Sequence, residues 1–253
     1  MLLGLILLIT TLAACLLITH PPVWFPVAIT GPAHAFDGQF TWTLWVTGIL
    51  FIAAQLLLAG IILRRRAANS VPAPSSSGVR ASLLAAAAMI AVEVALAAHG
   101  SSPLSHATAK NPEIIEVYAH QFAWNFRYPG PDGVFGRVKT EFIADAAGNP
   151  VGIDPSDSRG NDDVVVSTLR IPAGRPVRLM LHSRDVIHDF FVRELRTKQD
   201  IVPGMEIPLD VLADRPGQYE IACAELCGLA HNQMHGVLLV MPAEDYDQWK
   251  LKH

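Results

Sequence analysis

The sequence contains little charge. Lys, Arg, Asp and Glu make up 17% of its 253 residues, and the formal net charge is -4. Proteins that bind nucleic acid usually have a strongly basic patch or stripe, so this composition argues against a nucleic-acid partner. Together with a mean hydropathy of +0.32, the shortage of charge also argues against an ordinary soluble protein and predicts segments in contact with membrane lipid.

Cysteine is scarce as well. The chain has three cysteines, Cys15, Cys223 and Cys227, and none of them begins a Cys-x-x-Cys-His motif. A covalently attached c-type haem is therefore excluded.

The N-terminus lacks the Lys or Arg with which a secretory signal peptide normally opens. Residues 1–19 are nevertheless almost continuously apolar, and we predict an extra N-terminal transmembrane helix there. A signal-like segment is the alternative, because Leu12-Ala13-Ala14-Cys15 resembles the box before a lipid-modified cysteine. In a retained helix, Cys15 is a small buried apolar residue.

Two further apolar runs, residues 41–63 and 81–99, are long enough to be transmembrane helices. Arg64 to Arg66 end the first run and Arg80 precedes the second, so the segment 67–80 is predicted to be a flexible cytoplasmic loop. The N-terminus is then also cytoplasmic, and everything after about residue 100 lies on the outer face. Glu93, inside the last run, is expected to face a protein neighbour rather than lipid.

The second half of the chain, residues 108–253, has the texture of an all-β domain. Short β-branched and aromatic runs alternate with Gly- and Pro-rich turns, which predicts a β-sandwich or Greek-key barrel behind the membrane helices. The predicted strands are 114–126, 164–169, 177–183, 188–192, 205–211, 217–222 and 236–241, followed by a short amphipathic helix at 243–250.

Metal-binding side chains gather in the stretch CAELCGLAHNQM. It supplies the thiols of Cys223 and Cys227, the imidazole of His231 and the thioether of Met234. His188, at the start of a predicted strand, is the best candidate for a distant ligand. Sulfur mixed with imidazole favours copper or zinc, and the thioether favours copper. Two neighbouring thiolates can also bridge two copper ions that share one electron.

Two simpler interpretations remain open. Cys223 and Cys227 can form a disulfide, as thiols outside the cytoplasm commonly do. Alternatively, the two cysteines with His188 and His231 make a tetrahedral zinc site. Neither interpretation explains Met234.

These residues resemble subunit II of the haem-copper respiratory oxidases, a family with a cupredoxin-like domain and a binuclear CuA copper centre. The similarity extends to Tyr118-Ala119-His120-Gln121-Phe122-Ala123-Trp124 and to the segment KQDIVPGM at residues 198–205, and it spans about residues 41–249. It implies a protein of the bacterial inner membrane whose copper domain lies on the periplasmic face.

The resemblance assigns roles to individual residues. It implies copper ligation by His188, Cys223, Cys227, His231 and Met234. Glu225 would add its backbone carbonyl, and its side chain would reach a magnesium ion shared with the catalytic subunit I. Asp185 and Asp200 match acidic positions of the family, although each is equally consistent with a solvated turn residue.

Some positions depart from the family pattern. The electron-entry tryptophan of the family falls on Phe122, with Trp124 two residues later, so either ring is a candidate for electron entry. Both rings packing inside the sandwich is the simpler interpretation. A glutamate that feeds a proton pathway in many members falls near Arg80 here, which puts that entrance in doubt.

The implied function is that of a non-catalytic electron-entry subunit. It would accept electrons from a cytochrome c and pass them to the haems of the catalytic subunit, where oxygen is reduced to water and protons are translocated. The alternatives are the CuA subunit of a related nitric oxide reductase and a membrane-tethered copper-binding protein.

Overall fold

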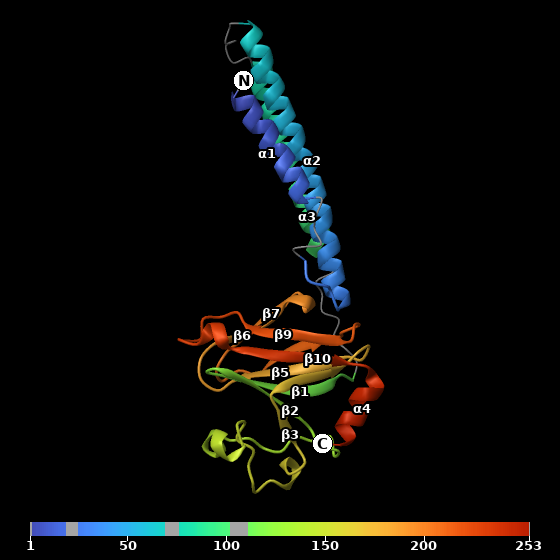
Figure 1. Ribbon diagram of the computed structural model, residues 1–253, viewed down its shortest axis with the longest axis vertical. Helices are drawn as coiled ribbons and strands as arrows, with labels where there is room; N and C mark the ends of the chain where they lie inside the picture. Colours follow the sequence, from blue (N-terminus) through green and yellow to red (C-terminus); the bar gives the residue numbers. More distant parts are fainter. Residues whose placement is uncertain (1, 19–24, 69–75, 102–110, 253) are drawn as a thin grey trace. The chain divides into compact units, whose positions relative to one another are not determined.

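The computed structural model describes residues 2–18, 25–68, 76–101 and 111–252 (Figure 1). The chain forms two compact units. One comprises Met1–Pro26 and Ala35–Ser105, and the other comprises Val27–His34 and His106–His253. The first unit is helical, and the second contains the strands.

The helical unit contains α1 (Leu2–Ile18), α2 (Gly31–Ala68) and α3 (Ser76–Ser101). Within α2 and α3, Gly31–Ile62 and Ser76–His99 are long and apolar enough to cross a membrane, whereas the apolar part of α1, Leu5–Leu16, is shorter. At 1.5 Å per residue the 38 residues of α2 extend about 57 Å, well beyond a hydrocarbon core about 30 Å thick. These two helices suit a membrane anchor.

The predicted spans 41–63 and 81–99 lie inside α2 and α3. Interpreting all of 67–80 as a loop was wrong at both ends, because Ala67 and Ala68 end α2 and Ser76 to Arg80 form the first turns of α3. Residues 69–75 lie outside the described part of the chain. Glu93 is exposed on α3.

The second unit is a β-sandwich, and Figure 1 shows its strands in two layers. One sheet has the order β3-β2-β1-β5-β8 and the other β4-β10-β9-β6-β7. The strands of the first sheet are β1 (Glu113–His120), β2 (Ala123–Tyr128), β3 (Val164–Val166), β5 (Val177–Ser183) and β8 (Ile207–Val211). Those of the second are β4 (Thr168–Pro172), β6 (His188–Val192), β7 (Thr197–Ile201), β9 (Gly217–Cys223) and β10 (His235–Met241).

Alternation along the strands produces the core between the sheets. Val117 and Leu179 from the first sheet and Phe190 and Leu238 from the second are almost completely buried. β1 pairs with β5 in parallel and β10 with β4 in parallel, while the other pairs are antiparallel. The sandwich confirms the predicted membrane-anchored all-β fold class.

Several predicted strand boundaries were wrong. The run 114–126 is two strands, because the chain turns at Gln121 and Phe122 and returns as an antiparallel hairpin. The run 164–169 is likewise divided between β3 and β4, which belong to different sheets. β7 was missed, because its sequence TKQDI lacks an apolar alternation. The predicted C-terminal helix is α4 (Ala243–Leu251), which buries Tyr246.

The segment just before α2 belongs to the sandwich unit. Ile29 is fully buried, and its backbone accepts a 2.8 Å hydrogen bond from the Asp214 amide and donates a 3.1 Å bond to the Glu194 carbonyl. Thr30 forms an isolated antiparallel bridge with Ala213. The β domain therefore includes residues far from its main sequence range.

Candidate metal centre

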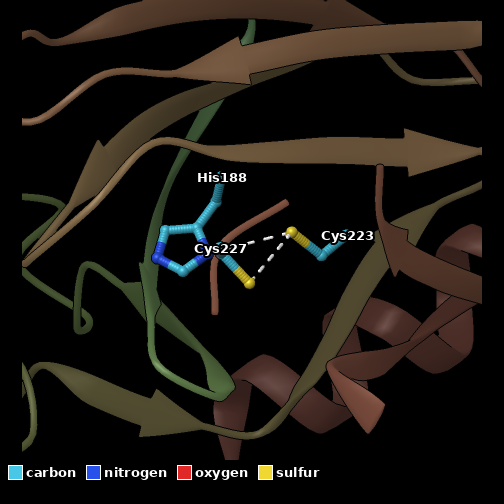
Figure 2. Close-up of side chains that lie close together, drawn as sticks. All are labelled: His188, Cys223 and Cys227. Atoms are coloured by element: carbon cyan, nitrogen blue, oxygen red, sulfur yellow. Dashed lines mark hydrogen bonds between the residues drawn. The ribbon is translucent and has the colours of Figure 1, made fainter. Parts of the chain in front are cut away.

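Strand pairing brings the distant histidine to the cysteine loop. β6 begins at His188, β9 ends at Cys223, and the two strands pair antiparallel with Phe190 opposite Cys223. The start of β6 and the end of β9 therefore lie at the same end of the sheet, where neighbouring strands begin and finish. Figure 2 shows His188, Cys223 and Cys227 pointing toward one another.

The two thiols form the middle of the site. Cys223 Sγ and Cys227 Sγ lie 3.7 Å apart, far beyond the S–S bond length of about 2.05 Å, and are free thiols in this structure. At this separation the two cysteines do not form the disulfide that the sequence left open.

Each thiol has its own imidazole. His188 Nδ1 lies 3.8 Å from Cys223 Sγ, and His231 Nδ1 lies 3.6 Å from Cys227 Sγ. Each also has one weaker donor: Cys223 Sγ is 3.2 Å from the Glu225 carbonyl oxygen, and Cys227 Sγ is 3.8 Å from Met234 Sδ. The six residues that the sequence suggests as one ligand set therefore lie close together, and their binding of a metal stays a prediction.

This donor set fits a pair of metal ions better than a single zinc ion. A structural zinc ion takes four ligands in a tetrahedron, whereas this site offers six donor atoms, the two cysteine sulfurs and four others beside them. Each sulfur has one imidazole nitrogen and one weak donor beside it, so two ions sharing both sulfurs would each find a similar environment. Thiolate and imidazole donors suit copper or zinc, and the thioether favours copper.

Asp185 orients the buried histidine. His188 is fully buried, and its Nε2 lies 2.8 Å from Asp185 Oδ1. When Nε2 carries the proton and donates it to this carboxylate, Nδ1 presents a lone pair to the cysteines. Burial raises the pKa of Asp185, but hydrogen bonds from the Gln121 amide, His188 and the Val186 amide outweigh it, and the net pKa is lowered.

The thiols are shielded from water. Cys223, Cys227 and Met234 are buried, whereas His231 is partly exposed. Burial, followed by the hydrogen bond and charge of Cys223, raises the pKa of Cys227 to about 11. The metal-free Cys227 thiol therefore keeps its proton at neutral pH, and a metal ion must displace that proton to bind the thiolate.

The two candidate electron-entry rings lie in different environments. Trp124 is buried in the core, edge-on to Phe190 with the ring centroids 5.9 Å apart. Phe122 is partly exposed, and its ring lies against Gly228 of the ligand loop, where an added Cβ would be 3.1 Å from Phe122 Cζ. Phe122 thus lies beside the ligand loop while also packing against the core, and Trp124 has the packing role of the simpler interpretation.

Asp200 is an exposed residue of β7. In the strand register it lies opposite Asp189, the residue that follows His188, and its carboxylate is 3.5 Å from Lys198 Nζ. The Glu225 side chain is partly exposed.

Sequence reasoning gave no role to Gln121. Its side-chain amide donates a 2.5 Å hydrogen bond to the Cys227 carbonyl, and its backbone amide donates a 2.8 Å bond to Asp185 Oδ2. Gln121 is 106 residues from Cys227, and a glutamine in a turn carries no local signal of such a contact.

Comparisons with known proteins show which family the chain belongs to. The family model described as cytochrome C oxidase subunit II, periplasmic domain, matches residues 114–241. A relative from Bradyrhizobium diazoefficiens, named alternative cytochrome c oxidase subunit 2, is 33% identical over 97% of this chain and 90% of its own length. A probable cytochrome c oxidase subunit 2 from Streptomyces avermitilis is 29% identical over 96% of this chain and 82% of its own length.

Among solved structures, the periplasmic domain of subunit II of the Bradyrhizobium japonicum cytochrome oxidase aligns with a TM-score of 0.42 and 21% identity. The alignment covers 58% of this chain and 96% of that one. The family model matches half of the sequence, and the Bradyrhizobium diazoefficiens relative aligns over nearly the whole chain. Together these two matches show the family. The chain belongs to the cytochrome c oxidase subunit II family and is a subunit of a haem-copper oxidoreductase complex.

Proposed function

We propose that this chain is the electron-entry subunit of a cytochrome c oxidase, with a binuclear CuA copper centre held by His188, Cys223, Glu225, Cys227, His231 and Met234. The observation that supports this most directly is the 3.7 Å pair of thiols, each with its own imidazole 3.6 to 3.8 Å away. When bound, a thiolate-bridged copper pair supplies a one-electron centre whose charge is shared between two metals.

The protein's residues would make this centre suitable for fast electron transfer. His188 is fixed by Asp185, and both cysteines come from buried positions at the end of a sheet, so ligand geometry changes little when charge arrives. Burial keeps water away from the thiolates and their charge. A rigid, dry ligand set needs little reorganisation in either redox state.

Electrons from a cytochrome c would arrive through the surface around Phe122. Gly228 beneath this ring lies between Leu226 and Leu229 in sequence, and these two leucines are 78% and 103% exposed. Exposed apolar side chains beside a redox site suit a transient protein partner. Electrons would leave to the haems of catalytic subunit I, where oxygen becomes water, and the Glu225 side chain would share a magnesium ion with that subunit.

The charges at the ends of the helices support an orientation. Arg64 and Arg80 flank the connection between α2 and α3, which assigns this connection to the cytoplasm by the positive-inside rule. The β-sandwich would then lie on the periplasmic face of a bacterial inner membrane, with the N-terminus of the chain in the cytoplasm.

Copper loading of the full-length chain in detergent tests the proposal. Full length is needed because Ile29, before α2, is part of the sandwich core. We expect two copper ions per chain, a purple colour and an electron paramagnetic resonance spectrum of one electron shared over two copper nuclei. Cys223→Ser, which removes one bridging sulfur, should lose the shared signal. A single-copper spectrum, or preferential binding of one colourless zinc ion, would contradict the binuclear site.

Purification of the complex then tests which donor supplies the electrons and which acceptor receives them. Haem analysis and turnover with oxygen or nitric oxide distinguish an oxidase from a nitric oxide reductase, and the proposal expects oxygen consumption driven by reduced cytochrome c. Recovery of a copper-loaded chain with no haem-containing partner would instead favour a membrane-tethered copper-binding protein.

A further inference from the structure

The turn between β1 and β2 contacts the metal-ligand loop through a glutamine side chain. Gln121 Nε2 donates a 2.5 Å hydrogen bond to the Cys227 carbonyl oxygen. This carbonyl belongs to the peptide that joins Cys227 to Gly228. Because a peptide unit is planar, fixing its oxygen fixes the orientation of the backbone on the C-terminal side of the Cys227 Cα.

The same turn is connected to the other ligand segment. The backbone amide of Gln121 donates to Asp185 Oδ2 at 2.8 Å, while Asp185 Oδ1 is 2.8 Å from His188 Nε2. One carboxylate thus contacts both the turn and the buried histidine. Through its side chain and its backbone, Gln121 therefore joins the segment of His188 to the loop of Cys227.

Gly228 permits this close approach. Its φ of +139° is disfavoured for residues with a side chain, and an added Cβ would lie 2.7 Å from Gln121 Nε2 and 3.1 Å from Phe122 Cζ. The loop backbone therefore packs directly under Gln121 and Phe122. A residue larger than glycine would push the turn and the loop apart.

We propose that Gln121 is a positioning residue of the metal centre. Its amide hydrogen bond holds the Cys227–Gly228 peptide against the Phe122 turn and so keeps Cys227 Sγ at its 3.7 Å separation from Cys223 Sγ. The role in copper geometry rests on the proposed binuclear copper site. The loop-positioning role is independent of copper and is measurable in the metal-free chain.

Two replacements of Gln121 separate the hydrogen bond from packing. Gln121→Met keeps a similar length but has no N–H donor, whereas Gln121→Lys keeps a donor on a side chain that has room, because Gln121 is exposed. Gln218→Leu, at an exposed glutamine of β9, is the control for removal of a surface amide. All variants are prepared as full-length chains in detergent with Cys15→Ser.

The first measurement uses metal-free protein. Alkylation of Cys227 by iodoacetamide is followed at fixed pH by mass spectrometry, with Cys223 as the internal comparison. In Gln121→Met we expect Cys227 to react about fivefold faster, because the loop loses one hydrogen bond and exposes the thiol more often. Gln121→Lys and Gln218→Leu should react at the wild-type rate. Equal rates in Gln121→Met and the wild type would overturn the positioning role.

The second measurement uses copper-loaded protein. Gln121→Met should still bind two copper ions, but with altered copper hyperfine splitting, a shifted reduction potential and about fivefold faster copper release to a chelator. Gln121→Lys should restore all three. A variant that is only less stable, with unchanged splitting and potential, would show that Gln121 is structural. If wild-type protein lacks the two-copper signal, the proposed function fails, whereas the alkylation result stands separately.

Discussion

Replacing Ile29 by alanine should destabilise the β-sandwich, although Ile29 lies before both α2 and α3 in the sequence. Its side chain is fully buried and belongs to the same core cluster as Leu179 and Phe190. Truncating a buried isoleucine to alanine costs about 2–5 kcal/mol, through lost burial and the cavity left behind. We expect about 3 kcal/mol here, because the flanking backbone hydrogen bonds to Glu194 and Asp214 limit collapse of the cavity.

The cost is measurable through the two buried thiols. In metal-free Cys15→Ser protein, labelling of Cys223 and Cys227 in increasing urea follows opening of the sandwich rather than of the membrane helices. With a urea slope of about 2 kcal/mol/M, a loss of about 3 kcal/mol moves the midpoint down by about 1.5 M.

Val27 provides a matched control in the same segment. Its side chain is 50% exposed, so Val27→Ala should move the urea midpoint by less than about 0.3 M. Equal midpoints for Ile29→Ala and Val27→Ala would refute the assignment of this segment to the sandwich core. The same result would make a fragment beginning at residue 108 a sound substitute for the full chain.

Two further predictions concern charged groups of the sandwich unit. Arg127 is buried and pairs with Asp163, whose side chain is fully buried, so Arg127→Leu should cost about 3–5 kcal/mol in urea unfolding by leaving that carboxylate unpaired. Arg175 is partly exposed and pairs with the exposed side chain of Asp247, so Arg175→Leu should cost less than about 1 kcal/mol. Hydrogen bonds from the Ser156 hydroxyl and amide lower the pKa of Asp154 from 3.8 to about 2. The folded state thus binds this proton less tightly than the unfolded state, and the stabilisation is present above about pH 4 and lost as the pH falls through 2. Asp154→Asn should flatten the acid-unfolding curve between pH 4 and 2, and an unchanged curve would contradict this assignment.

Local patterns were sufficient for the long apolar helices and for the candidate ligand types. Long apolar runs predict helices, because only a helix satisfies its own backbone hydrogen bonds in lipid. Cys223, Cys227, His231 and Met234 lie within twelve residues of sequence, so their shared chemistry is visible without a fold. His188 was found because it opens a strand, and the β6–β9 pairing brings it to Cys223.

The strand boundaries were less predictable. The run at 114–126 contains apolar residues on both sides of the turn at Gln121 and Phe122, so hydrophobicity alone does not reveal where the chain reverses. β7 pairs antiparallel with β6 along its whole length. Its mostly polar sequence gives no sign of this pairing, so the strand could not be predicted from the sequence.

The sequence by itself determined the long apolar helices, the all-β class of the second half and the grouping of candidate metal ligands, because each depends on residues close together in the chain. Only the tertiary structure decided which partners support these donors. It paired Asp185 with His188, joined Gln121 to Cys227, buried Trp124 while leaving Phe122 partly exposed, and inserted Ile29 into the sandwich core. These contacts join residues far apart in sequence, and their energies depend on burial and distance, which local composition does not encode.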